Sequence, residues 1–246
     1  MALLKVLLLL LGLGVSLNSG VSLQKRIIGG QNCDDRDHLY YVRLDSNNGT
    51  HRIRCGGSLI HRQWILTTAH CWKPGWTMAA VLKVHPRTAG EQRQEIRRAP
   101  EIYALFGKQH DIMMLKLETP VSGVPLAQLP DCRRRLRRGD VVQLAGEGAT
   151  TTHPNNQRLR ISAIPANLQC VNMDVVKVSL FEPKHGHYFR ISAPNKDICY
   201  GDDGGAAMYD GMIYGVISIV REDVCRSPVA IMDVCEYLGW IKHKLS

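Results

Sequence analysis

Gly201-Asp202-Asp203-Gly204-Gly205 is the stretch that decides the fold, once it is combined with three segments that precede it. Leu66-Thr67-Thr68-Ala69-His70-Cys71 ends one predicted strand, and Asp111-Ile112-Met113-Met114-Leu115-Lys116 begins another. The pair Lys25-Arg26 stands directly before Ile27-Ile28-Gly29-Gly30. Each segment alone is a weak signal, so the information lies in their order and in the histidine and aspartates that they carry.

Short strands separated by Gly, Pro, Asn and Asp fill most of the chain, which indicates an all-β sandwich or barrel. The C-terminal stretch differs, because Val234, Leu238 and Ile241 are spaced as on one face of a helix. No Pro/Gly/Ser-rich linker divides the chain. The predicted strands are 40–44, 57–60, 64–68, 80–84, 112–117, 141–145, 175–180, 212–220 and 229–234, and the predicted helix is 234–245.

Together and in this order, the four segments closely resemble the chymotrypsin/trypsin-like serine proteases, and the resemblance extends from Ile27 to Ser246. It implies an all-β fold of two six-stranded antiparallel β-barrels, with the site between them and a C-terminal α-helix. It also implies a secreted zymogen that is cut after Arg26. The freed amine of Ile27 would then pair with Asp202, since both groups are present.

The mechanism of this family needs a serine that attacks the carbonyl, a histidine that takes its proton and a buried aspartate that orients the histidine. His70 and Asp111 match the last two, but the family motif GDSGG reads GDDGG here, and Asp203 stands at the nucleophile position. Asp203 beside His70 would favour the protonated imidazole, which cannot act as a general base. We therefore expect a vestigial triad without catalytic function, although backbone donors at Gly201 and Asp203 could still form an oxyanion hole.

The same resemblance places Asp197 at the floor of the specificity pocket, where it would favour Arg or Lys in a substrate. Two glycines usually line the walls of this pocket. The chain reads Ser218-Ile219-Val220 at the first position and Pro228-Val229 at the second. We expect Val220 and Val229 to fill most of the slot, and the alternative is a slip of the local alignment. Further drift appears at Gly146-Glu147-Gly148, where the family usually has a tryptophan between the glycines.

The N-terminal residues 1–13 form an apolar run, MALLKVLLLLLGL, that is too short to span a bilayer comfortably. We predict a signal peptide over 1–20 with its end between 16 and 22, a propeptide over 21–26 and one domain over 27–246. The alternative is a buried helix or a signal anchor. Secretion would make Asn48 in Asn48-Gly49-Thr50 a glycosylation site, and the alternative is an unmodified polar loop.

Eight cysteines in 246 residues suggest disulfides and an oxidising compartment. The resemblance implies a Cys55–Cys71 bond near His70, a Cys199–Cys225 bond across the pocket and a Cys132–Cys235 bond to the C-terminal helix. The usual family partners of the other two are absent, and family geometry implies that these two lie far apart. We therefore predict that they stay unpaired, either buried and inert or available for a disulfide-linked oligomer in place of a monomer. The two cysteines are Cys33 and Cys170.

The basic charge of the chain is concentrated in one segment. There are 31 Lys and Arg against 22 Asp and Glu, a formal net charge of +9, and Arg133-Arg134-Arg135-Leu136-Arg137-Arg138 holds five of the arginines. The spacing resembles a heparin-binding consensus, and arginine suits bidentate recognition of sulfate or phosphate. If Cys132 bonds Cys235, this loop could form one patch with Lys242 and Lys244. The alternative is a solvated surface loop.

Three functions are compatible with these observations. The first is a secreted, catalytically inactive homologue that binds a polyanion such as heparan sulfate, lipopolysaccharide or an anionic surface, in innate defence as in other non-catalytic members of the family. The second is an active trypsin-like endopeptidase, and the third is a decoy or carrier that binds a protein through the vestigial cleft. We expect no nucleic-acid partner, because aromatic residues make up only 6%. We also expect no cofactor, no transmembrane segment and no metal, since His185-Gly186-His187 offers only two ligands.

Overall fold

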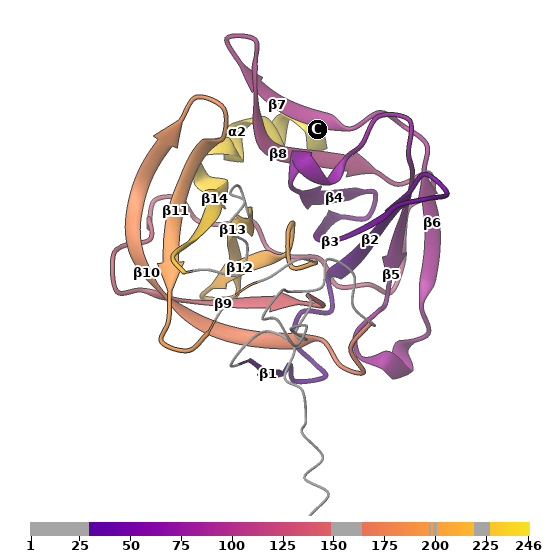
Figure 1. Ribbon diagram of the computed structural model, residues 1–246, viewed down its shortest axis with the longest axis horizontal. Helices are drawn as coiled ribbons and strands as arrows, with labels where there is room; N and C mark the ends of the chain where they lie inside the picture. Colours follow the sequence, from indigo (N-terminus) through magenta and orange to yellow (C-terminus); the bar gives the residue numbers. More distant parts are fainter. Residues whose placement is uncertain (1–29, 149–163, 197, 199–200, 219–226) are drawn as a thin grey trace, which may run out of the picture.

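Two antiparallel sheets make up the fold and lie side by side, each curled into a barrel-like layer (Figure 1). The computed structural model describes residues 30–148, 164–196, 198, 201–218 and 227–246. Seven strands are hydrogen-bonded in each sheet within these residues, if the two-residue strand β1 is counted in the second. The two-barrel, all-β fold class that the motifs implied is confirmed.

The first sheet has the strand order β6-β5-β2-β3-β4-β8-β7. Its strands alternate between the barrel interior and the outer face, so that Val42 and Leu44 are buried in the main core cluster while Arg43 and Asp45 lie on the opposite face. The strands are β2 (Tyr41–Asn47), β3 (Arg52–His61), β4 (Trp64–Thr67), β5 (Thr77–Leu82), β6 (Gln92–Ile96), β7 (Glu101–Leu105) and β8 (Lys108–Lys116).

The second sheet has the order β1-β10-β11-β14-β13-β12-β9, and an additional pairing of β10 with β9 closes it. Its interior holds a second cluster of branched apolar residues, including Val171, Ile191 and Ile231. The strands are β1 (Gln31–Asn32), β9 (Val141–Gly146), β10 (Gln169–Glu182), β11 (Gly186–Ser192), β12 (Ala206–Tyr209), β13 (Met212–Ile217) and β14 (Val229–Asp233).

Helix α2 (Val234–Leu245) ends the chain, as its apolar spacing predicted. Asp233 caps it, because its side chain accepts the backbone N–H of Cys235. Val234, Tyr237 and Ile241 are buried against the first core cluster, whereas the polar face carries basic residues in the last turn. Among the described residues, no helix is long and apolar enough to cross a membrane.

The prediction that Cys33 and Cys170 remain unpaired is wrong, because they form a disulfide with a Cα–Cα distance of 5.0 Å. The physical reason is strand β1, which pairs with β10 so that Gln31 lies opposite Cys170. The backbone N–H of Cys33 then donates to Leu168 and brings the two sulfurs together. Neither thiol is free, so the disulfide-linked oligomer predicted through them loses its basis.

The other cysteine predictions have two outcomes. Cys55–Cys71 and Cys132–Cys235 are bonded as the resemblance implied. Cys199 and Cys225 lie outside the described residues, so their pairing stays a prediction.

Candidate active-site cleft

His70 and Asp111 meet where β4 and β8 bring their segments together. His70 lies in the short 3-10 helix η1 (Ala69–Cys71), which the Cys55–Cys71 disulfide ties to β3. Asp111 lies in β8; its Oδ1 accepts the backbone N–H of His70, and its Oδ2 lies 2.8 Å from His70 Nδ1. Two contacts from one carboxylate fix the imidazole ring, as the motifs predicted.

Ser218 supports this carboxylate from the second barrel. Its hydroxyl donates to Asp111 Oδ2, and its backbone N–H donates to Ala230 beyond the start of β14. Burial favours the neutral acid, but the hydrogen bond and charge of His70, together with the Ser218 hydroxyl, outweigh it and lower the pKa of Asp111. The sequence assigned Ser218 to the specificity pocket, and the structure shows in addition that it holds Asp111.

Asp203 faces the other nitrogen of the same ring, with its Oδ1 3.4 Å from His70 Nε2. Its backbone carbonyl accepts the N–H of Gly56 at 2.6 Å, which holds the turn against β3. The next residue, Gly204, has a φ of +81°, and a Cβ there would lie 2.2 Å from the carbonyl oxygen of Gly56. The turn therefore requires glycine after Asp203 and presents a carboxylate to His70.

His70 thus lies between two carboxylates. Burial opposes its charged form, but the charges of Asp203 and Asp111 and their hydrogen bonds outweigh burial and raise the pKa of His70 to about 10. At neutral pH the ring is an imidazolium with a proton on both nitrogens. A ring in this state can donate protons but cannot accept one from a nucleophile or a water.

The specificity pocket is only partly within the described residues. Val229, in β14, is buried in the second core cluster and pairs in register with Ile191 of β11. Asp197 and Val220 lie outside the described residues. The blocked pocket therefore stays a prediction, and a buried valine at 229 agrees with it.

Asp202 is fully buried beside the segment that follows β9. Its Oδ1 accepts the N–H of Gly148 at 2.8 Å. A Cβ added at Gly146 or Gly148 would lie 2.0 Å or 2.3 Å from a carboxylate oxygen of Asp202, so both glycines are needed for this approach. Arg26 and Ile27 lie outside the described residues, and the predicted ion pair of the Ile27 amine with Asp202 stays untested.

A buried ionic network next to Asp202 is the feature that sequence reasoning missed. Glu147, which stands where the family usually has tryptophan, accepts hydrogen bonds from Arg43 Nε at 2.6 Å and from Arg87 at 2.7 Å. The side chains of Arg43 and Glu147 are only 3% and 1% exposed. Glu91 bridges the two arginines at 2.7 Å and 3.1 Å. The network joins β2 of the first sheet to the end of β9 in the second.

Replacing Glu147 by Gln is expected to lower the free energy of unfolding by about 3 kcal/mol, because Arg43 then keeps its buried charge without its nearest counter-ion. Urea denaturation measures the change. The matched control is Glu91→Gln, which touches the same two arginines but is 44% exposed, and it should cost below about 1 kcal/mol. Equal costs for the two variants would show that burial of Glu147 is not what makes the network important.

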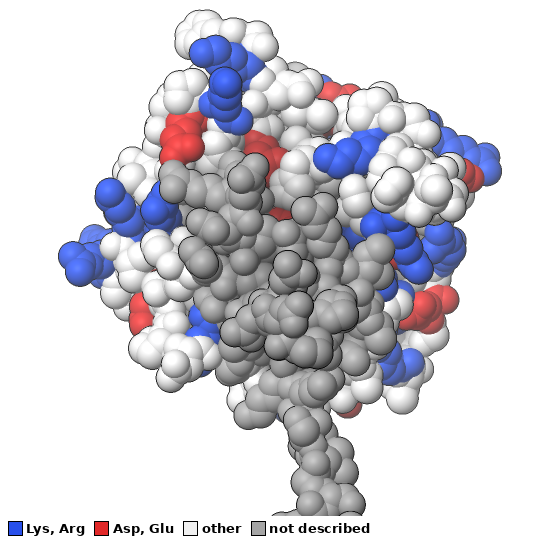
Figure 2. All heavy atoms as spheres, viewed as in Figure 1, with Lys and Arg blue, Asp and Glu red and all other residues white. Residues whose placement is uncertain are grey.

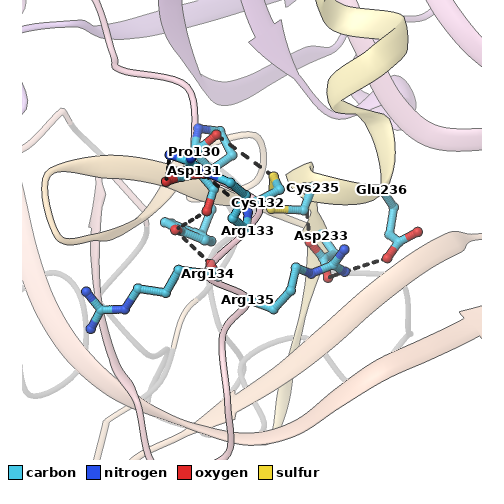
Figure 3. The surroundings of a disulfide bond; sticks show 10 residues. Pro130, Asp131, Cys132, Arg133, Arg134, Arg135, Asp233, Cys235 and Glu236 are labelled. Carbon is cyan, nitrogen blue, oxygen red and sulfur yellow. Dashed lines mark hydrogen bonds and ion pairs between the residues drawn. A yellow bond between two sulfur atoms is a disulfide. The ribbon is translucent and has the colours of Figure 1, made fainter.

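The arginine loop, residues 133–138, lies beside the first turn of α2, as the Cys132–Cys235 bond implied. Its arginines point in different directions (Figure 3), and each of the first three pairs with at least one acid. Arg133 pairs with Asp131 at 2.8 Å, Arg134 with Asp210 at 3.2 Å and Arg135 with both Asp233 and Glu236.

The four remaining basic groups of the predicted patch are exposed or paired elsewhere. Arg137 and Arg138 are exposed, and neither forms an ion pair with an acid among the described residues. Lys242 is exposed on α2, whereas Lys244 pairs with Glu101 of β7 at 2.7 Å. The seven basic groups therefore do not form one continuous patch of free charge.

A cleft of about 760 Å³ runs beside His70. Apolar side chains such as Trp72 and Ile102 line it together with His110 and His185. His185 is buried, neither of its ring nitrogens has a hydrogen-bond partner within the described residues, and burial lowers its pKa. The lining residues come from η1, β7, β8 and the loops beside them, so the cleft combines apolar surface with the imidazole of His70.

Metal ligands and the glycosylation site complete the list of predicted positions. Two groups of possible metal ligands occur within the described residues, and in each the two cysteines are bonded to one another, so that they offer no thiolate.

Asn48 lies exposed in the turn between β2 and β3, where its Oδ1 accepts the backbone N–H groups of Thr50 and His51. Its modification stays a prediction.

Comparisons with known proteins show which family the chain resembles. The family model described as Trypsin matches residues 27–241. A serine protease, sp-Eoc49, of Echis ocellatus is 31% identical over 88% of this chain and 86% of its own length. Trypsin-4 of Rattus norvegicus is 29% identical over 95% of this chain and 96% of its own.

A similar solved structure supports the fold. That of neuropsin, a serine protease expressed in the mouse brain, matches with a TM-score of 0.71 at 23% identity and covers 89% of this chain and 100% of its own. The family model spans well over half of the chain. The chain therefore belongs to the trypsin family of serine proteases.

Proposed function

We propose that the protein is a secreted, catalytically inactive homologue of the trypsin-like proteases and that it acts by binding. The observation that carries this proposal is the carboxylate of Asp203, 3.4 Å from His70 Nε2, at the position of the nucleophile. A carboxylate attacking an amide would leave as readily as it arrived. With His70 held protonated, no general base remains to activate a hydroxyl or a water in its place.

The proposed ligand is a polyanion such as heparan sulfate, lipopolysaccharide or an anionic surface, which would suit a role in innate defence. Arg137, Arg138 and Lys242 offer exposed cationic groups for it. The ion pairs of Arg133 and Arg134 are exposed to solvent, so a sulfate can replace the acids at little cost. Secretion is supported by the three disulfides within the described residues and by relatives that include snake venom serine proteases.

A second candidate is a decoy or carrier that binds a protein through the vestigial cleft. The observation that favours it is the open space of about 760 Å³ beside His70, with Trp72 and Ile102 in its lining. A ligand there would bury apolar surface and lie next to the charged imidazole.

The test uses protein cut after Arg26. Chromogenic peptides with Arg or Lys before the scissile bond and an irreversible serine-directed label are applied to wild type and to His70→Ala. We expect no turnover and no labelling above the His70→Ala control, because the nucleophile is missing.

Turnover or labelling well above that control would overturn the inactive assignment. Binding is measured separately on a heparin column and by pull-down from the native fluid. Retention on heparin supports the polyanion role, whereas a tight complex with a protease inhibitor supports the decoy role. Absence of both interactions would contradict a binding function.

A further inference from the structure

One buried carboxylate on the outer face of the first sheet is surrounded by three arginines. Asp45 of β2 is 5% exposed, and its oxygens lie 3.0 Å from Arg52, 3.9 Å from Arg54 and 3.6 Å from Arg93. The two exposed arginines, Arg52 and Arg93, therefore share one buried carboxylate, and Arg54 lies beside it.

The strand register explains why these residues meet. Asp45 lies opposite Arg54 of β3 and opposite Ala79 of β5. Arg52 precedes Arg54 by two residues in β3 and is on the same face. Arg93 of β6 lies opposite Val81 of β5, one strand further out. Arg52 and Arg54 thus come from β3 on one side of Asp45, and Arg93 comes from β6 on the other side. Ala79 of β5 lies between and is small, so the guanidinium groups have room to converge.

The exposed ends of these arginines face solvent. Arg52 is 48% exposed and Arg93 is 57% exposed, whereas Asp45 lies beneath them. Figure 2 shows basic side chains gathered over the side of the molecule where Figure 1 places β5 and β6. This arrangement differs from the loop at 133–138, where each of the first three arginines has an acid of its own.

We propose that this face, formed by Arg52, Arg54 and Arg93 around Asp45, is a binding site for a sulfated polysaccharide. A sulfate group placed over Arg52 and Arg93 accepts hydrogen bonds from two planar guanidinium groups. It also adds a second negative charge for Arg52 and Arg93, which share the single carboxylate of Asp45. The site is separate from the loop at 133–138 and does not depend on whether the triad is inactive.

The chemistry of the face favours a sulfated sugar over an acidic segment of a protein. The residues around the cluster are polar, namely the half-buried Asn47 and the exposed Thr77, Glu95 and Arg97. The large exposed apolar side chains among the described residues are Phe106, Val141, Ile164 and Phe181, and none belongs to β2, β3, β5 or β6. A protein ligand usually adds apolar anchors to its charges, and this face offers nothing for them to contact.

The experiment compares three double variants on a heparin column and by titration at several salt concentrations. Arg52→Gln/Arg93→Gln removes two charges from the cluster, Arg137→Gln/Arg138→Gln removes two from the loop, and Arg36→Gln/Arg62→Gln removes two exposed arginines that belong to neither. Melting temperatures check that each variant is folded.

We expect the cluster variant to elute at clearly lower salt than the Arg36/Arg62 control and its salt dependence to fall by about two released ions. Binding at 150 mM salt should weaken by roughly tenfold, whereas desulfated heparin and poly-glutamate should bind wild type weakly.

A cluster variant that elutes with the control overturns this inference, and if the loop variant elutes early the proposed polyanion function still stands. Poly-glutamate that binds as tightly as heparin, with the same loss in the cluster variant, would make the ligand an acidic protein and also overturn it. Wild type that does not bind heparin at all contradicts both this site and the polyanion function. As a second readout, Asp45→Asn should raise the elution salt if the variant is folded, because it adds one net positive charge, and unchanged elution of the folded variant counts against the site.

Discussion

Loss of the Cys33–Cys170 bond is expected to lower the free energy of unfolding by about 5 kcal/mol. The bond closes a sequence separation of 137 residues, and a cross-link over such a length removes many conformations from the unfolded chain. Cys33→Ala/Cys170→Ala restores those conformations and leaves β1 with only its short pairing to β10. Urea denaturation of the double variant measures the change.

The matched control is Cys55→Ala/Cys71→Ala, which opens a separation of only 16 residues. The same chain-entropy relation gives about 3 kcal/mol for it. We also expect native wild type to run as a monomer without reducing agent and to show no reaction of Cys33 or Cys170 with a thiol dye. Labelling of either cysteine, or a smaller loss for the long bridge than for the short one, would contradict the pairing.

The elements that could be predicted are those whose residues alternate or repeat clearly. Strands with a buried apolar face, such as β4 and β9, and helix α2 lie within a few residues of the predicted ranges. Strand β6 reads Gln92-Arg93-Gln94-Glu95-Ile96, with almost no apolar side chain, and strand β12 begins with two alanines. Both form because neighbouring strands supply their hydrogen bonds, which no local pattern reveals.

The cysteine error has a similar origin. Strand β1 contains two exposed polar residues, Gln31 and Asn32, and carries no strand signal of its own. Only its pairing with β10 brings Cys33 next to Cys170. The cysteines that the resemblance implies as partners of Cys33 and Cys170 are absent from the sequence. The bond between Cys33 and Cys170 is instead set by this tertiary contact.

The candidate site was predictable where a motif carries the chemistry and not where charges meet from distant segments. The motifs identified His70, Asp111 and Asp203, and the structure brings all three together. In the sequence, the ionic network of Glu147 is indicated only by a glutamate between two glycines, where the family usually has tryptophan. Arg43, which pairs with Glu147, is located among buried apolar residues of β2.

The arginine loop shows the opposite limit, because the sequence overstated its free charge. Five arginines in six residues are visible in the chain, and Asp131 beside them pairs with Arg133, but the counter-ions of Arg134 and Arg135 are far away in sequence. Asp210, Asp233 and Glu236 lie roughly 75 to 100 residues further along and pair with Arg134 and Arg135. The Asp45 cluster is less dense in sequence, but its exposed arginines Arg52 and Arg93 share one buried acid instead of each having an acid of its own.

The imidazole of His70 provides the most direct measure of what the Asp203 carboxylate does. In a protease with serine at this position, the ring has one carboxylate neighbour and must be able to lose its proton at neutral pH. Here a second carboxylate lies 3.4 Å from Nε2. The first carboxylate, Asp111, is present in both situations, so the effect of the second can be isolated by one neutral substitution.

Asp203→Asn is expected to lower the pKa of His70 from about 10 toward the ordinary histidine value of about 6.5. Because the folded pKa is raised, its contribution to stability in wild type is fully present below about pH 6.5 and is lost as pH rises toward 10. The variant should lose most of this pH dependence. Resonances of the imidazole ring followed by NMR give the pKa, and urea denaturation at pH 6, 8 and 10 gives the stability.

The control for this substitution is Asp210→Asn, which removes the same charge from an exposed aspartate and should leave the pKa of His70 unchanged. If Asp203→Asn also leaves the pKa of His70 unchanged, the carboxylate of Asp203 does not keep the ring protonated. The physical reason that His70 cannot act as a general base would then be removed. If the pKa falls while peptide turnover stays absent, two separate obstacles to catalysis follow. The ring can then accept a proton again, but position 203 still offers no hydroxyl for it to activate.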